Sequence, residues 1–381
     1  NNSPLIREYR NQALSIALDS QLIAANFRPQ INATITNIYA PVFNNFGYDE
    51  AISNGGTYTG MVSATKTFVG AANRTAQLRS AGLMADSAVI ASKSSVQDLR
   101  RTITAQYITA FGDLQQYRSN RQIHELLIQE DMLFKELTRK NVYTQTDYLT
   151  FLVTLKQQQL QLKQSWIQYQ TDFANLNYLC GIFDTNAAST TLELPSFQVP
   201  VLPDPNNSIF LYKYTLDSLR LSNQISLINY SYKPRVDVFG DVGYASSRFT
   251  NILHTFGFSG GFTLTIPIYD GSRRKFNIAK LKLEEDTRIN YRSFFVRQYY
   301  QQIAQIRQQL QSAEELLGAI NEQIEYTEGL IKVNQQLLQT GDVKVSDFII
   351  AINNYLTAKF LATQNSVNKL QIINQLNYWN K

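Results

Sequence analysis

Residues 256–274 read FGFSGGFTLTIPIYDGSRR, and this stretch predicts a β-strand that leads directly into a helix. Its apolar residues recur at every second position, which is the period of a strand with one apolar face. The residues of that face are Phe256, Phe258, Gly260, Phe262, Leu264, Ile266 and Ile268. Asp270, Gly271 and Ser272 then end the strand. The length suits a tilted strand that crosses a bilayer, which needs about 9–11 residues.

The helix that follows is unusually long and carries a coiled-coil seam. Mostly apolar residues recur alternately three and four positions apart over about six heptads. They are Val296, Tyr299, Ile303, Ile306, Leu310, Ala313, Leu317, Ile320, Ile324, Thr327, Ile331, Asn334 and Leu338. We therefore predict a helix over about 272–339, which would extend roughly 100 Å at about 1.5 Å per residue. Gly341 is the expected cap, and a returning helix is predicted over about 345–379.

A partner strand precedes the quoted stretch. After Pro234, the apolar residues Val236, Val238 and Val242 lie on one face and Asp237, Phe239 and Asp241 on the other, so the strands of this half cover about 235–270. One such hairpin, taken alone, is equally typical of a sheet half buried in a soluble core.

The same plan occurs twice in the chain. Leu-Asn-Tyr occupies 176–178 and again 376–378, and Asp147 is echoed by Asp347. Self-similarity at this period indicates two copies of one unit. We assign 1–182 and 208–381 to the copies and 183–207, which carries four prolines, to a linker. The first copy has a predicted helix over about 4–26, strands over about 30–69, and long helices over about 71–139 and 145–180. Asn141 stands where the second copy has Gly341, and Asn also reaches the left-handed conformation.

Composition excludes several classes of function. The net charge of +5 comes without a dense basic patch, which argues against nucleic-acid binding. One cysteine, Cys180, and two histidines, His124 and His254, leave no Cys- or His-rich metal site within one chain. We read His124 as an interhelical packing residue. No phosphate loop, nucleophile elbow or HExxH motif is present, so we expect neither an enzyme nor a bound cofactor.

The two hairpins give only four strands, and a sheet of four strands has two unpaired edges. Four strands cannot close a barrel, and a membrane tolerates no open sheet edge. If the strands lie in a membrane, several chains must share one barrel. The alternative is a coiled-coil scaffold outside the membrane whose hairpins mediate assembly.

This twice-repeated order of helix, strand hairpin and long helical hairpin resembles the TolC-like outer-membrane efflux proteins over essentially the whole chain. The segments that carry the resemblance are Arg28-Pro29-Gln30-Ile31, Lys233-Pro234-Arg235-Val236, Ile266-Pro267-Ile268-Tyr269-Asp270-Gly271-Ser272-Arg273-Arg274, and Thr340-Gly341-Asp342 through Ser346-Asp347-Phe348. The resemblance implies a mixed α and β membrane protein. Three copies would form a twelve-stranded β-barrel in the outer membrane of a Gram-negative bacterium and a twelve-helix α-barrel in the periplasm.

The resemblance also implies a function and its partners. Such a homotrimer would be a passive exit duct of a tripartite efflux pump or of a type I secretion system. It would contact outer-membrane lipid, a periplasmic adaptor (membrane fusion) protein and an inner-membrane transporter of the RND, ABC or MFS type. The loops near 40–56 and 246–255 would face outside, and the helical turns near 138–147 and 338–347 would form the periplasmic tip.

Candidate site residues follow from that arrangement. Asp147 and Asp347 each lie in the first turn of a returning helix, and in a trimer each becomes a ring of three carboxylates that favours cations. An acidic residue is also favoured there by the helix dipole alone. Ile350 is a candidate hydrophobic constriction. Adaptor docking is assigned to Asn141, Gly341 and Asp342. The lipid-facing residues are predicted to be Val236, Val238, Val242, Phe256, Phe258, Phe262, Leu264 and Ile266.

Overall fold

A computed structural model describes residues 4–44, 46–49, 55–184, 192–194, 197–200 and 208–380. Most of the predicted linker 183–207 and part of the loop 40–56 lie outside the described residues. The chain forms two compact units, a helical unit (1–7, 92–211 and 294–381) and a sheet unit (8–91 and 212–293). Each unit contains residues from both sequence copies, so the two units do not correspond to the two copies.

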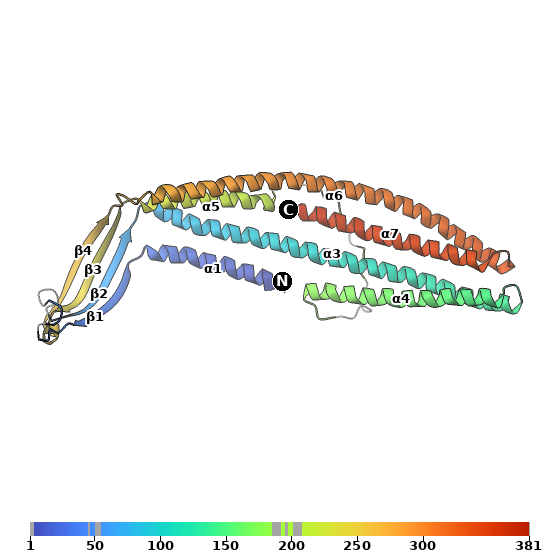
Figure 1. The fold of residues 1–381 in the computed structure, drawn as a ribbon, viewed down its shortest axis with the longest axis horizontal. Helices are drawn as coiled ribbons and strands as arrows, with labels where there is room; N and C mark the ends of the chain where they lie inside the picture. The colour runs from blue at the N-terminus through green and yellow to red at the C-terminus, as the bar shows by residue number, and fades with distance from the viewer. Residues whose placement is uncertain are drawn as a thin grey trace. The chain divides into compact units, whose positions relative to one another are not determined.

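The sheet unit contains four antiparallel strands in the order β1-β2-β3-β4 (Figure 1). The strands are β1 (Gln30–Tyr39), β2 (Gly56–Phe68), β3 (Arg235–Ser246) and β4 (Phe256–Thr265). A short 3-10 helix, η2 (Phe249–His254), lies between β3 and β4, and the helices α1 (Pro4–Asn26) and α5 (Ile209–Ser231) precede β1 and β3. Both predicted hairpins are confirmed. They are joined by pairing of β2 with β3, so one sheet contains both copies.

The strand register collects the apolar residues on one face of the sheet. Val238 lies opposite Phe262, and Val242 lies opposite Phe258 on one side and Val62 on the other. Directly opposed residues share a face, so the alternating apolar positions of neighbouring strands coincide. The other face carries mainly threonine, serine, asparagine and aspartate, with Thr67 donating a 2.6 Å hydrogen bond to Asp237. The sheet therefore has an apolar and a polar side.

The end of β4 differs from the prediction. The strand ends at Thr265, whereas we predicted strand structure to 270. Pro267 explains the early end, because proline has no N–H to donate to a neighbouring strand. Ile266, predicted as a lipid-facing strand residue, therefore lies just beyond β4.

Four long helices contribute to the helical unit. They are α3 (Ala71–Arg139), α4 (Gln145–Cys180), α6 (Arg273–Thr340) and α7 (Val345–Trp379). These bounds match the predicted ones, with α6 displaced by one residue. The predicted heptad seam is the buried face of α6. Its residues Tyr299, Ile303, Ile306, Leu310 and Ala313 form one core cluster with Ile372, Ile373 and Leu376 of α7.

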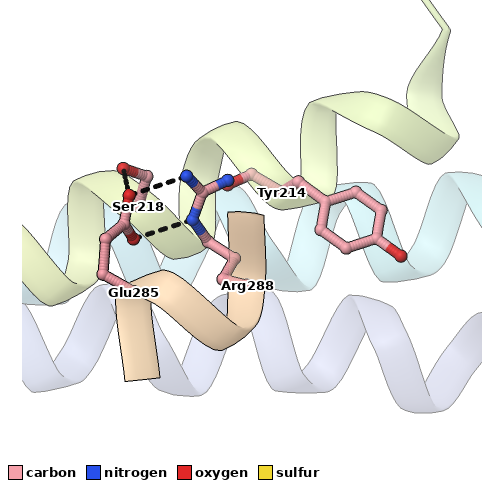
Figure 2. Close-up of polar contacts among 4 residues, drawn as sticks. All are labelled: Tyr214, Ser218, Glu285 and Arg288. Carbon is pink, nitrogen blue, oxygen red and sulfur yellow. Dashed lines mark hydrogen bonds and ion pairs between the residues drawn. The ribbon is translucent and has the colours of Figure 1, made fainter. Parts of the chain in front are cut away.

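In the sheet unit, a polar network fastens α5 to α6 (Figure 2). The guanidinium of Arg288 donates to both carboxylate oxygens of Glu285, at 2.7 and 2.6 Å, and to the main-chain carbonyl of Tyr214 at 3.0 Å. Ser218 of α5 donates to the same carboxylate at 2.9 Å. Hydrogen bonding to Arg288 lowers the pKa of Glu285. Charge-assisted bidentate bonds of this kind are stronger than neutral ones, so the network fixes the N-terminal half of α5 against α6.

Candidate functional site

The two turns that close the helical hairpins have the same main-chain geometry. Asn141 has φ of 61° and Gly341 has φ of 80°, so both lie in the left-handed region. The N–H of Val142 donates to the carbonyl of Leu137, and the N–H of Asp342 donates to that of Leu337, each at 3.0 Å. This is the Schellman pattern, in which the first residues after the helix satisfy its last carbonyls. The predicted equivalence of Asn141 and Gly341 is confirmed.

The two turns also contact each other. The hydroxyl of Tyr143 donates to the carbonyl of Val343 at 3.0 Å. Gly341 lies beneath Val142, since a Cβ atom at Gly341 would be 2.6 Å from Cγ1 of that side chain. Corresponding positions of the two copies therefore face each other, and the structure brings Asn141, Gly341 and Asp342 together with Tyr143 at one end of the helical unit.

An aromatic core lies directly behind these turns. The Phe134 ring is fully buried, and its centroid lies 4.5 Å from that of Phe151, 5.5 Å from that of Tyr143 and 6.3 Å from that of Phe348. Leu338, also fully buried, belongs to the same cluster. Because α3, α4 and α7 all contribute rings, this core locks the two hairpins together. We did not predict it from the sequence, although Phe134 falls on the seam position that corresponds to Asn334.

The two candidate gate aspartates have different surroundings. Asp147 is half buried and forms a capping box: its carboxylate accepts from the N–H of Thr144 at 3.0 Å, while its own N–H donates to Oγ1 of Thr144 at 3.2 Å. In the second copy Lys344 replaces the threonine and supplies no side-chain cap. Asp347 is exposed, and Ser346 donates to its carboxylate at 3.3 Å. Ile350 is exposed as well. The carboxylate of Asp147 therefore takes part in a helix cap, whereas that of Asp347 does not.

The predicted lipid-facing residues lie on the apolar face of the sheet, apart from Ile266 beyond its end. Phe258 and Phe262 of β4 are 91% and 73% exposed. Val238, Val242, Phe256 and Leu264 are exposed too, and Val236 is half buried. Exposed aromatic and aliphatic side chains on one continuous face are typical of a surface that binds another protein or a membrane.

A second heptad seam runs along α6 and is exposed. Each of its members immediately precedes a residue of the buried seam, so it faces about 100° away on the helix. The members are Leu316, Ala319, Gln323, Tyr326, Leu330, Val333 and Leu337. The exposed side of α4 also carries apolar residues, namely Leu149, Val153, Leu160 and Ile167. A helix with two adjacent apolar seams can pack against two neighbours at once.

Of the helices described, none combines the length and apolar character needed to cross a bilayer. Among the described residues, no group of three or more His, Cys, Asp or Glu side chains is placed to hold a metal ion.

The sequence and the fold were compared with those of known proteins. No protein-family model and no curated protein matches the sequence. Solved structures do match. CusC is 11% identical with a TM-score of 0.82, covering 100% of this chain and 89% of its own. VceC of Vibrio cholerae, an outer membrane protein, is 11% identical with a TM-score of 0.79, covering 100% and 93%.

A third solved structure shares the arrangement. The MtrE outer membrane channel of Neisseria gonorrhoeae, in its open state, is 13% identical with a TM-score of 0.75, covering 99% of this chain and 85% of its own. The match extends over both copies, the sheet and the helical hairpins. The chain therefore has the fold of the TolC-like outer-membrane channels, as the sequence motifs predicted.

Proposed function

We propose that this chain is one protomer of a homotrimeric exit duct in the outer membrane of a Gram-negative bacterium. The observation that carries the proposal is the sheet: it has one apolar face, one polar face, and an open edge at β1 and at β4. In a bilayer those edges must be paired. If the sheets of several copies join into one closed barrel, β1 and β4 each hydrogen-bond to a strand of a neighbouring copy. The apolar face of the sheet then contacts lipid, and the polar face lines a channel.

Three copies are supported by the fold and by the helices. Four strands per chain become twelve, within the range of known membrane barrels. The exposed seam of α6, centred on Tyr326 and Leu330, needs a helical neighbour. The exposed side of α4, with Leu160 and Ile167, offers matching apolar residues in an adjacent copy. Repeating that contact around a threefold axis closes a ring of helices.

Such a duct is passive, and its control lies in partner binding. A ligand shifts a conformational equilibrium only by its differential affinity for the two states. We assign the joined turns around Asn141, Gly341 and Asp342 to docking of a periplasmic adaptor, whose helices would compete with the contacts of Tyr143. An inner-membrane transporter of the RND, ABC or MFS type would supply cargo and energy, for drug efflux or for type I secretion.

Fractionation tests the proposed location. The full-length protein should remain in the outer-membrane fraction after washes with high salt and alkaline carbonate, and should enter solution only with detergent. Detergent-purified protein should then produce ion conductance in planar bilayers. Release by salt or alkali alone would contradict the duct and favour a coiled-coil scaffold outside the membrane.

The unequal surroundings of the two aspartates yield a second prediction, for the gate. Asp347→Ala should change single-channel conductance, or its block by divalent cations, with little change in stability, because that carboxylate caps nothing. Asp147→Ala should instead lower stability by about 1 kcal/mol, the usual cost of losing a helix cap.

Planar-bilayer recordings and thermal unfolding of the two variants check this division. Asp347→Asn is the matched control, since it removes the charge and keeps the size of the side chain. If conductance and divalent block both stay at wild-type values in the Asp347 variants, that residue is not part of the gate.

A further inference from the structure

The two helical hairpins differ in the chemistry of their seams. At positions 200 apart, α3 carries polar or titratable residues where α6 carries apolar ones. The pairs are Gln106 and Ile306, Asp113 and Ala313, Asn120 and Ile320, His124 and Ile324, and Asp131 and Ile331. Three atoms on this part of α3, Asp113 Oδ2, Gln116 Oε1 and His124 Nδ1, are buried and have no hydrogen-bond partner among the described residues. Beside its apolar cluster of Phe111, Leu114, Tyr169 and Phe173, the first hairpin therefore carries polar groups at seam positions that are apolar in the second.

At the centre of this polar seam, two carboxyl groups meet. Asp113 of α3 and Asp172 of α4 share a side-chain hydrogen bond. The Asp172 carboxylate also accepts from Nε2 of Gln106 at 3.0 Å and from the side chain of Gln168. The corresponding residues of the second hairpin, Ala313 and Ile372, are both buried in an apolar cluster. An apolar contact in one copy is thus replaced by an acid pair in the other.

A hydrogen bond between two carboxyl groups requires one proton. Burial, together with the bond to Asp172, raises the pKa of Asp113 to about 7. Burial opposes ionisation of Asp172, but hydrogen bonds from Asp113 and Gln106 outweigh it and lower the pKa of that group. Asp113 is therefore the group that holds the proton and donates it.

The other charged groups nearby do not neutralise the pair. On α3, the charge of Arg118 acts on Tyr169. On α7, Val367 packs against α3 at Gly112. Lys369 of α7 is engaged in an ion pair of 2.9 Å with Glu314 of α6. Loss of the proton would leave two carboxylates facing each other.

We propose that Asp113 and Asp172 form a proton-dependent latch of the first helical hairpin, closed while they share one proton and loosened when that proton is lost. The latch concerns the hairpin itself and would operate in a scaffold as well as in a duct.

The direction of the pH dependence follows from linkage. Folding raises the pKa of Asp113 from 3.8 to about 7. Asp113 therefore stabilises the folded state fully below pH 3.8, and this stabilisation is lost as the pH rises through about 7. The pKa of Asp172 is lowered, so its contribution is present above 3.8 and is lost as pH falls below that value. The hairpin should therefore be tightest at weakly acidic pH and loosen above neutrality.

Spin labelling of the detergent-purified full chain tests the latch. We would introduce Gln122→Cys and Gln164→Cys on exposed positions of α3 and α4, in a Cys180→Ala background, and attach nitroxide labels. Distance distributions are measured by pulsed electron paramagnetic resonance from about pH 5.5 to about pH 8.5, on either side of the Asp113 pKa. We expect a narrow distribution at acidic pH that broadens with a midpoint near 7.

Three comparisons make the result decisive. Labels at the matched positions of the second hairpin, through Glu322→Cys and Gln364→Cys, should report no broadening over the same range. Asp113→Asn, whose amide can donate at every pH, should keep the first hairpin narrow throughout. So should the double variant Asp113→Ala/Asp172→Ile, which carries the second-copy residues. A wild-type distribution that does not change with pH, or broadening that persists in both variants, would overturn the latch.

Discussion

Phe262→Arg should prevent assembly of the protein in the outer membrane. Phe262 is 73% exposed on the apolar face of β4, opposite Val238. If that face meets lipid, an arginine near the bilayer midplane costs about 2–4 kcal/mol per copy. Three copies in one barrel would carry the cost three times. We expect loss of the assembled species on semi-native gels and loss of conductance in planar bilayers.

Thr263→Arg is the matched control for this change. Thr263 is adjacent in sequence and exposed, but it lies on the polar face opposite Asp237, where a cation meets an opposite charge. This variant should assemble, with altered conductance. Equal assembly of the Phe262 and Thr263 variants would mean that the apolar face of the sheet does not contact lipid.

Phe134→Ala should release the two helical hairpins from each other at their turns. Removing a fully buried phenylalanine typically lowers stability by about 3–5 kcal/mol, through lost burial and the cavity left behind. The loss would be local, because the Phe134 ring contacts Tyr143 and Phe151 of the first copy and Phe348 of the second. We expect faster amide hydrogen exchange at both turns and longer open times in planar bilayers.

Met132→Ala provides the comparison for Phe134. Met132 lies on the same helix and is 70% exposed, so its truncation removes little buried surface. Exchange at the turns should then stay at the wild-type rate. If the Phe134 variant exchanged at that rate too, the aromatic core would not hold the hairpins together.

The helices were predictable because their period is strong. The seam from Val296 to Leu338 continues without interruption, and Gly341 ends it, so α6 and α7 were placed within a residue of their bounds. The strands were predictable from alternation for the same reason. The end of β4 was missed because alternation continues through Ile266 and Ile268, although Pro267 removes a donor needed for pairing.

Contacts between the copies were not predictable from local pattern. Nothing in the periodicity of Phe134 shows that its ring meets Phe348, since helical spacing defines a face but not its partner. The cap on Asp147 was accessible, because Thr144 precedes it by three residues as in a capping box. The polar seam could also have been predicted from the sequence, because aligning the two copies places Asp113 at the position of Ala313. Only the structure shows that Asp172 of α4 lies beside Asp113. His124 does lie on this seam, with its Nδ1 atom buried.

The pairing of β2 with β3 has a consequence for how the protein is made. Each hairpin joins strands that are close in the chain and can form early, whereas β2 must wait for β3, which follows both long helices of the first copy. Contacts between distant segments form slowly, because the intervening chain loses entropy before they contribute. During synthesis and export, the first hairpin therefore has no partner for its inner edge. That edge is closed only when the second half of the chain arrives.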